Sequence, residues 1–319
     1  MRDTMRFGLF LLLIAATLSG QAETGASCPP VAEKPPLEAM EAARLNARDH
    51  GFLWRVSKDG RTSYLYGTMH VGKLDWSFPG PAVMQALSKA STVALELDML
   101  DADIQNRLVM GMANMRSVAL PDGLVKRLRQ QAESACVPYA AIAALSPEMQ
   151  IDMLTLMVGR REGLDAAYAT DAVLAGVGHR QKKNVVSLET PESQLQLLQM
   201  ADMQQTVALV EDGLDELESG RSRAMLTRIA KVWADSDYAD MAHFDEWCGC
   251  LDTEIEREMM KRLLDDRNPG LADRIDALHK SGEQVFAAVG SLHMFGPAAL
   301  PTLLEKRGYR VERIDFKPM

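Results

Sequence analysis

The sequence predicts an α+β fold, in which a mixed central β-sheet is flanked by helices. Two observations predict it. Residues 63–98 and 284–316 share one order of elements: a strand, a Gly-x-x-His motif, a loop, a helix opened by proline and a second strand. Most of the chain between these units has the apolar spacing of helices. We therefore expect two related halves of one sheet, each with a strand-Gly-x-x-His-helix-strand unit, and a helical insertion between them.

The first unit opens with a predicted β-hairpin. Its strands are LWRVS and TSYLYG, on either side of a Lys-Asp-Gly turn at residues 58–60. The Pro-Gly-Pro sequence at residues 79–81 then predicts the start of a helix. The alternation of apolar and polar residues in TVALELD predicts the closing strand at residues 92–98.

The second unit repeats this order near the C-terminus. VFAAVGS, at residues 285–291, predicts a strand. GPAALPTLLEKRG predicts a helix, because proline stands near its start and glycine at its end. YRVERIDF, at residues 309–316, predicts the last strand.

The chain between the two units is predicted to be mainly helical. Apolar spacing, prolines at starts and glycines at ends predict helices over residues 146–159, 165–181, 192–219, 221–235 and 252–280. One strand, NVVSLET at residues 184–190, interrupts them. The chain has 20 methionines, which we interpret as core filling or a flexible apolar groove rather than a metal-binding surface.

The N-terminus predicts export. Residues 1–22 contain two arginines, then an apolar run and then small residues, which is the order found in a signal peptide. A retained anchor is the alternative, although the run is shorter than the roughly 20 residues of a membrane span. Residues 23–51 are predicted to be a leader, poorly ordered or with a short helix, and residues 52–319 a single domain. We expect a periplasmic or secreted protein, with envelope association and oligomeric state left open.

The net charge argues against one class of partner, and the cysteines suggest disulfides. The formal net charge of −9 becomes −10 when residues 1–22, with two basic residues and one acidic residue, are removed. Such an acidic protein is a poor partner for nucleic acid. Export makes disulfides plausible among Cys28, Cys136, Cys248 and Cys250, with free buried thiols as the alternative. Because a bond between Cys248 and Cys250 would close a small strained ring, we expect each to pair with a distant cysteine.

The two Gly-x-x-His motifs are the first candidates for chemistry. Each follows an apolar strand and precedes another glycine, and they contain His70 and His293, two of only six histidines. Glycine lets the backbone turn at a strand end, and in sheets with helical crossovers such ends form the ligand crevice. We predict that the two rings meet at one edge of the sheet. Two hydrogen-bonded structural histidines are the alternative.

Acidic residues at the end of another strand complete a predicted metal site. Alternation in TVALELD places Glu96 and Asp98 on one face and the apolar residues on the other. Two imidazoles and a carboxylate suit a divalent ion such as Mn, Zn or Co, with a position open for water. We predict His70, His293 and Glu96 as ligands and Glu96 as catalytic. Asp98 is predicted to bind substrate, or to be a solvated strand end.

Two further residues are candidates for this crevice. Glu189, at the end of NVVSLET, is predicted to face the substrate or to cap the next helix. Arg267 is predicted to bind a substrate carboxylate or an oxyanion, with a surface ion pair to Asp265 or Asp266 as the alternative. The other histidines lack such context and are interpreted as ordinary: His50, His179, His243 and His279.

Five segments together resemble the TraB/GumN family. They are LWRVSKDGRTSYLYGTMHVG, VALELD, NVVSLETPESQ, LLDDRNPGLADRI and VFAAVGSLHMFGPAALPTLLEKRGYRVERI, which span residues 52–316. That family is related to the TIKI membrane-bound metalloproteases, which inactivate Wnt ligands. It is related more loosely to erythromycin esterase and to the haem-binding lipoprotein ChaN.

The resemblance implies a mixed sheet wrapped by helices and a metal-dependent hydrolase centre. The family's two Gly-x-x-His motifs fall on residues 67–70 and 290–293, its glutamate on Glu96 and its arginine on Arg267. The TIKI proteins carry a membrane anchor, which we do not expect in this chain once residues 1–22 are removed, and we do not carry over their Wnt substrate. Two other residues match a further family pattern, for which we expect a structural or substrate-facing role: Glu189 and Gln194.

Three functions fit these residues. The first is a metal-dependent hydrolase of the periplasm or envelope, of the peptidase type, acting on a peptide or small molecule. The second is a non-catalytic protein that binds haem, metal or a peptide in the same crevice. The third is an envelope scaffold in which both motifs only close the sheet. A nucleophile elbow, a phosphate-cradling loop and an H-E-x-x-H helix are absent from the sequence, which disfavours serine-type hydrolysis and nucleotide chemistry.

Overall fold

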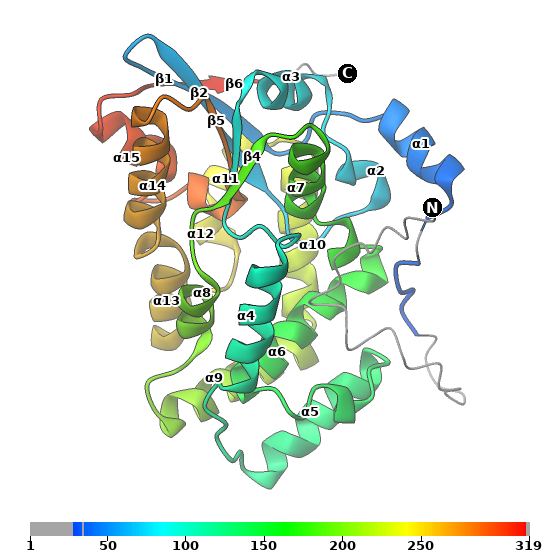
Figure 1. Cartoon of the computed structure of the whole chain (residues 1–319). Helices are drawn as coiled ribbons and strands as arrows, with labels where there is room; N and C mark the ends of the chain where they lie inside the picture. Colours follow the sequence, from blue (N-terminus) through cyan, green and yellow to red (C-terminus); the bar gives the residue numbers. More distant parts are fainter. Residues whose placement is uncertain (1–27, 34, 317–319) are drawn as a thin grey trace.

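A computed structural model of the chain describes residues 28–33 and 35–316. Within this part, six strands form one sheet in the order β4-β3-β5-β2-β1-β6, surrounded by helices (Figure 1). The strands are β1 Phe52–Lys58, β2 Arg61–Thr68, β3 Thr92–Leu95, β4 Asn184–Ser187, β5 Val285–Gly290 and β6 Arg310–Ile314.

The sheet is mixed. β1 pairs antiparallel with β2 and β6, whereas β2, β5, β3 and β4 are parallel neighbours in that order. β1 and β2 form the predicted hairpin, in which Asp59 and Gly60 take the left-handed backbone of a tight turn, with φ of 52° and 72°. The predicted α+β fold with a mixed central sheet is therefore confirmed.

The central strands are buried on both faces. All six residues of β5 and all four of β3 are buried, which explains their continuous apolar sequences. Phe286, Leu65 and Leu53 are fully buried members of the core on the two sides of this sheet. In this central part of the sheet, side chains therefore reach solvent from the loops that follow the strands rather than from β3 and β5 themselves.

The structure breaks some of the predicted helical ranges into shorter helices. They are α1 Leu37–Leu45, α2 Leu74–Ser77, α3 Pro81–Lys89, α4 Ala102–Ala113, α5 Asp122–Ser134, α6 Pro147–Met157, α7 Thr170–Arg180, α8 Pro191–Leu198, α9 Met203–Ser219, α10 Arg221–Ala234, α11 Tyr238–Ala242, α12 Phe244–Trp247, α13 Glu254–Met260, α14 Asn268–Lys280 and α15 Leu300–Lys306. The range predicted over 192–219 is interrupted because Asp202 caps α9 by accepting from the N–H of Gln205 at 2.9 Å. The range predicted over 252–280 contains a π-helical turn, Lys261–Asp265, before α14 begins.

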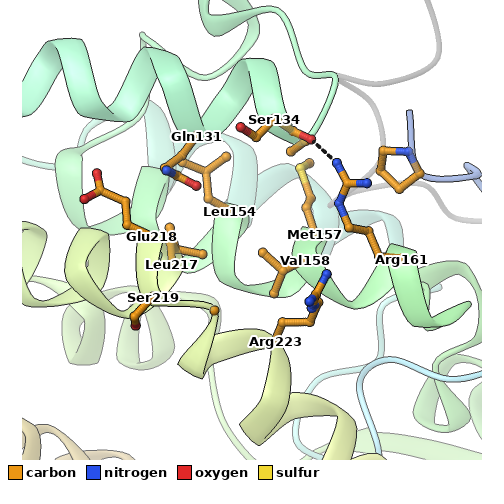
Figure 2. Close-up of a pocket in the computed structure, with 13 residues that line it drawn as sticks. Gln131, Ser134, Leu154, Met157, Val158, Arg161, Leu217, Glu218, Ser219 and Arg223 are labelled. Carbon is orange, nitrogen blue, oxygen red and sulfur yellow. Dashed lines mark hydrogen bonds between the residues drawn. The ribbon is translucent and has the colours of Figure 1, made fainter. Parts of the chain in front are cut away.

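Helices between β3 and β5 include a layer with its own apolar core, which corresponds to the predicted insertion. α5, α6 and α9 contribute side chains such as Leu128, Leu154 and Val210 to it. A hollow of about 420 Å³ lies beside this core, between α5, α6 and the start of α10 (Figure 2). At its rim, Arg161 donates to the backbone oxygen of Ser134 at 2.8 Å. The layer therefore has an apolar core separate from that of the sheet.

The two predicted halves are only partly alike in space. β2 and β5, which lead into the two Gly-x-x-His motifs, are parallel neighbours. The strands that close the two units differ, because β3 is parallel to β5 whereas β6 is antiparallel to β1 at the edge of the sheet. A relationship between the halves stays a prediction.

Two disulfides are present, and one contradicts the expected pairing. Cys28 is bonded to Cys136, 108 residues away, and Cys248 is bonded to Cys250. The expectation that Cys248 and Cys250 each join a distant cysteine is therefore wrong. Gly249 has a φ of 59°, and this left-handed backbone brings the two α-carbons to 5.1 Å, within the usual range for disulfides. Disulfides are typical of proteins in oxidising compartments.

The predicted export signal, residues 1–22, lies outside the described residues, as do residues 23–27. The described part of residues 23–51 contains α1. β1 begins at Phe52, where we predicted the start of the domain. Among residues 28–33 and 35–316, no helix has the length and apolar character needed to cross a membrane.

Candidate functional site

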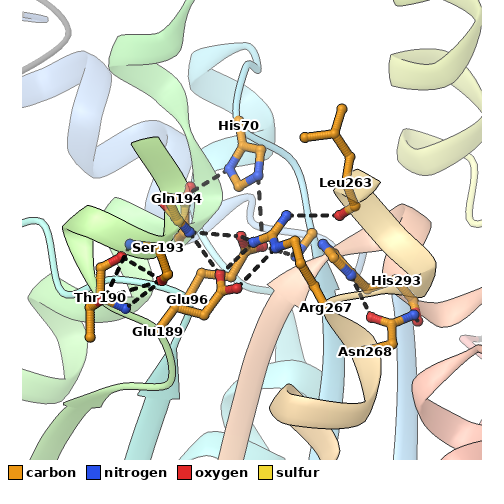
Figure 3. Close-up of polar contacts among 12 residues, drawn as sticks. His70, Glu96, Glu189, Thr190, Ser193, Gln194, Leu263, Arg267, Asn268 and His293 are labelled. Carbon is orange, nitrogen blue, oxygen red and sulfur yellow. Dashed lines mark hydrogen bonds and ion pairs between the residues drawn. The ribbon is translucent and has the colours of Figure 1, made fainter. Parts of the chain in front are cut away.

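The two motif histidines leave neighbouring strands at the same edge of the sheet. β2 ends at Thr68, which pairs with Gly290 at the end of β5. His70 follows β2 by two residues, and His293 lies in the 3-10 turn Ser291–Met294 directly after β5. Because parallel strands end at a common edge, the sequence motifs bring both rings to this edge (Figure 3).

Both imidazoles and Glu96 surround the α-carbon of Gly290. A Cβ at Gly290 would lie 3.2 Å from Oε1 of Glu96, 3.3 Å from Nε2 of His70 and 3.6 Å from Cδ2 of His293. Glycine at this position therefore leaves the space toward which the three side chains face. The residues predicted as metal ligands are thus brought together by the fold.

Gly67, at the start of the first motif, is required for a different reason. A Cβ there would lie 2.7 Å from Oγ and 3.1 Å from the α-carbon of Ser291. The backbone oxygen of Gly67 also accepts a hydrogen bond from Nε1 of buried Trp233 at 2.9 Å. The end of β2 is therefore fixed closely against the turn that carries His293.

Glu96 follows β3 and joins these histidines to Arg267. Its Oε1 accepts from the backbone N–H of Gly290 at 2.7 Å and lies 3.9 Å from Nε2 of His70. Its Oε2 accepts from Nη2 of Arg267 at 2.5 Å. Only 12% of the Glu96 side chain is exposed, so these contacts occur where charges interact more strongly than in water.

Arg267 links two glutamates. Its Nε and Nη2 donate to the two carboxylate oxygens of Glu189 at 2.9 and 2.5 Å, in addition to the bond with Glu96. Its Nη1 donates to the backbone oxygen of Leu263 at 3.0 Å. A guanidinium has five N–H donors, so one hydrogen of Nη1 is left for another partner. Asp266, an alternative partner considered for this arginine, instead pairs with a lysine.

Glu189 belongs to the same group. Nε2 of Gln194 donates to Glu189 at 2.9 Å and to Glu96 at 3.3 Å. The alternative role of Glu189 as a helix cap is taken by Thr190, which forms a capping box with Ser193 at the start of α8. Glu189 therefore faces the site, together with the glutamine that the family pattern pairs with it (Figure 3).

Each histidine has a hydrogen-bond partner that our sequence analysis missed. Nδ1 of His70 bonds to Oδ2 of Asp171 at 3.1 Å, and Nδ1 of His293 bonds to Oδ1 of Asn268 at 2.5 Å. Asn268 uses its Nδ2 to donate to the backbone oxygen of His293, so its Oδ1 is the acceptor. In its neutral form each ring therefore carries the proton on Nδ1 and presents the lone pair of Nε2. Asp171 and Asn268 lie at helix starts, and no sequence pattern distinguishes them from ordinary residues there.

Their surroundings give the two histidines different proton affinities. Partial removal from water lowers the pKa of His70, but the carboxylates of Asp171 and Glu96 outweigh this effect and raise the pKa to about 9. Burial lowers the pKa of His293 to about 4, although the charge of Glu96 opposes it. Burial raises the pKa of Glu96, yet the positive charges of His293, His70 and Arg267 bring it down to about 2. His293 is therefore held neutral and Glu96 ionised near neutral pH.

Asp98 is not brought into this group. β3 ends at Leu95, so the two-residue alternation that placed Asp98 beside Glu96 does not extend so far. The Asp98 side chain is 5% exposed and its Oδ2 lies 2.7 Å from Nε2 of His179. The expectation of a solvated strand end is wrong, and this geometry gives no support to a substrate-binding role for Asp98.

The remaining histidines lie apart from the site and have local partners. His50 and His243 bond to the backbone oxygens of Ala234 and Ala239 through Nδ1. His279 is fully buried, and its two nitrogens bond to Ser63 and to the backbone of Lys58. These contacts are the hydrogen bonds expected of structural histidines.

The imidazole and carboxylate groups around Gly290 are of the kinds that bind a divalent ion, although the carboxylate of Glu96 already has hydrogen-bond partners. Imidazoles whose Nδ1–H groups are hydrogen-bonded, as in His70 and His293, are typical of metal ligands. Glu96, however, bonds to Arg267 and to the backbone of Gly290. Within the described ranges, no group of three or more His, Cys, Asp or Glu side chains is arranged so that it could hold a metal ion.

Comparisons with known proteins identify relatives. Residues 52–313 match the model of the TraB/PrgY/gumN family. Two proteins named "Uncharacterized protein YbaP", from Shigella flexneri and from Escherichia coli strain K12, are each 25% identical over 255 residues, which is 76% of this chain and 88% of the relative. No solved structure matches the chain. Because the family match covers most of the chain and contains both Gly-x-x-His motifs, the protein belongs to the TraB/PrgY/gumN family.

Proposed function

We propose that this protein is a metal-dependent hydrolase of the peptidase type, with a divalent ion bound by His70, His293 and Glu96. The observation that carries the proposal is the convergence of these side chains around Gly290, with Nδ1 of each ring held by a hydrogen bond so that Nε2 is the nitrogen that would bind the ion. Mn, Co and Zn suit such a set of donors. The resemblance to the TIKI metalloproteases favours the peptidase type.

The charges of the site support the binding of a cation. The carboxylates of Glu96, Glu189 and Asp171 all lie within hydrogen-bond distance of Arg267 or His70. One guanidinium cannot neutralise three carboxylates, so the site attracts additional positive charge. A proton on His70 supplies part of it in the metal-free protein, and a divalent ion would replace that proton.

Each residue of the site has a distinct part in the proposed reaction. His70, His293 and Glu96 would hold the divalent ion, which when bound would lower the pKa of water and so make it a better nucleophile. Arg267 and Gln194 hold Glu96 and Glu189 in fixed positions through their hydrogen bonds. The remaining Nη1 hydrogen of Arg267 is available to a substrate carboxylate or to the oxyanion that develops during hydrolysis. The ring of His70, which is 55% exposed, lies on the side from which a peptide or small molecule would enter.

The proposed location is the periplasm or the outside of the cell. Two disulfides are typical of oxidising compartments, and the N-terminal sequence has the pattern of an export signal.

Metal analysis of the exported protein tests the proposal. Wild type would be purified from the periplasm together with His70→Ala, His293→Ala and the control His243→Ala, whose exposed ring bonds only to its own helix. We expect about one metal ion per chain in wild type and control and little in the other two variants. Added Mn, Co or Zn should stabilise wild type by about 2.7 kcal/mol at a concentration one hundred times Kd. Hydrolysis of a peptide mixture should be lost with a chelator and restored by the ion.

Other outcomes of the same experiment are equally informative. Equally low metal in all four proteins would overturn the proposal. Metal in the site without hydrolysis of any peptide would favour a non-catalytic metal-binding protein. A visible absorption band in the purified protein would indicate haem instead.

A further inference from the structure

The neighbours of His70, Met69 and Val71, are buried in the core, but packing does not hold the ring of His70 itself. More than half of its side chain, 55%, is exposed, whereas His293 is 3% exposed. The ring of His293 is therefore fixed by its surroundings. The direction of the His70 ring therefore depends on the hydrogen bonds made by the ring and by residues 69–72, the segment that follows β2.

Those hydrogen bonds come from one segment, residues 165–171. The backbone N–H of Gly72 donates to the oxygen of Asp165 at 3.0 Å, and the N–H of Asp165 donates back at 2.9 Å. Before His70, Met69 exchanges hydrogen bonds with the backbone and hydroxyl of Thr170, each at 3.0 Å. The residue after Thr170 is the aspartate that bonds to the ring of His70. The two segments are thus joined before, at and after the histidine.

The side chain of Asp165 fixes the shape of this segment. It is 5% exposed, and its Oδ2 lies 3.2 Å from Nε of Arg160, which is also buried. Its Oδ1 accepts from the N–H of Ala167 at 2.9 Å and so starts the turn that leads to Thr170. From the other side, the N–H of Ala32 in the N-terminal leader donates to Oδ2 at 3.3 Å. One buried carboxylate therefore determines where the partners of His70 lie.

Residues 69–72 and 165–171 are in close contact at Gly72. A Cβ at Gly72 would lie 2.8 Å from the backbone oxygen of Tyr168. An added methyl group would therefore push the loop of His70 away from the segment of Asp165. This gives a second way to disturb the same contact without removing the carboxylate.

We propose that Asp165 is a positioning residue for His70. It touches neither substrate nor the reacting atoms, and acts by holding residues 165–171 against the loop of the histidine. Its consequence for metal affinity rests on the proposed function, whereas its effect on the position of the ring does not.

The test compares two variants that disturb the contact with the loop of His70 with two control variants remote from that loop. Asp165→Asn removes the charge, and Gly72→Ala separates the segments. Asp276→Asn is the matched control, because Asp276 is 8% exposed and bonds to Tyr309 and two lysines remote from the site. Gly123→Ala is the control for the added methyl group, since a Cβ there would meet nothing within 4 Å.

The first readout is the Cε1–Hε1 NMR signal of His70 in the metal-free full-length exported protein, assigned with His70→Gln. We expect this signal to shift in Asp165→Asn and Gly72→Ala and to stay in place in both controls, while the signal of His293 does not move. The second readout is the affinity for Zn²⁺, which should fall at least tenfold in Asp165→Asn and less than twofold in Asp276→Asn. Asp165→Glu, which keeps the charge, should recover part of this loss.

The outcomes separate this inference from the proposed function. If Asp165→Asn and Asp276→Asn lose similar stability and neither moves the signal of His70, Asp165 is only a structural residue and the inference is overturned. If wild type binds none of Zn²⁺, Mn²⁺ and Co²⁺, the proposed function fails, but the NMR signal still decides the role of Asp165. If Asp165→Asn does not fold, the comparison of Gly72→Ala with Gly123→Ala gives the decision.

Discussion

Arg267 and Glu96 meet at the centre of the site, where Nη2 of the arginine lies 2.5 Å from Oε2 of the glutamate and only 12% of each side chain is exposed. The same guanidinium also binds Glu189. Two carboxylates that would repel each other in a partly buried site are thereby held side by side. Much of the local stability should therefore depend on this one cation.

Replacement of Arg267 by alanine should cost about 3–5 kcal/mol of unfolding free energy, because it leaves buried carboxylates without their partner. Arg267→Lys should recover only part of this loss, since a single ammonium cannot form the bidentate contact with Glu189 and reach Glu96 as well. Urea unfolding measures both. Arg310→Ala, which removes an exposed pair with Glu312, should change stability by less than about 1 kcal/mol. An equally small effect at Arg267 would contradict this account.

Stability should fall in mild acid because His293 is buried as the neutral ring. Its folded-state pKa of about 4 is below the ordinary value of 6.5, so between these values the unfolded chain binds more protons than the folded one. Folding free energy from this group is therefore present above pH 6.5 and is lost as pH falls toward 4, by up to about 3 kcal/mol. Unfolding measured from pH 7 to pH 4 should show a shallower dependence in His293→Gln. The same slope in both proteins would rule out this source.

The contact of Gly67 with Ser291 predicts that a single methyl group disturbs the site. Gly67→Ala should cost about 1–3 kcal/mol through overpacking, because its Cβ would lie within 3.1 Å of two atoms of Ser291. Adding Ser291→Gly should recover part of the loss by removing the nearer atom. Gly270→Ala lies in α14, where a Cβ would meet nothing within 4 Å, and should instead stabilise by about 0.5–1 kcal/mol. Thermal or urea unfolding distinguishes the three.

The two disulfides should contribute unequally to stability. The bond between Cys28 and Cys136 closes a long loop, so its removal should cost about 2–4 kcal/mol by releasing entropy of the unfolded chain. The bond between Cys248 and Cys250 spans one residue, and its removal should cost less by the same argument. Unfolding of the two double Cys→Ser variants tests this order, and the reverse order would show that the local loop depends on its disulfide.

The meeting of His70, His293 and Glu96 could be predicted because it depends on where the strands end, which short sequence patterns indicate. A glycine after an apolar strand marks the strand end, and parallel strands end at one edge, so His70 and His293 could be placed together before any coordinates. Glu96 follows from the same rule, since it comes one residue after β3. These residues are separated in sequence but fixed by the order of strands.

Other parts depend on contacts that no local pattern contains. Asp98 was misplaced because the strand stops at Leu95, and its buried pair with His179 depends on how α7 packs. Asp171 and Asn268 were missed because each looks like any polar residue at a helix start. The short disulfide was rejected on ring size, although Gly249 supplies the backbone conformation that allows it.

The two rings differ in exposure, so the site has a solvent-facing side at His70 and a buried side at His293. A reagent that modifies imidazole will meet His70 first and will reach His293 only after the protein has opened. Any molecule that binds without such opening must approach past His70, so its shape on that side, rather than near the sheltered ring, decides whether it is admitted.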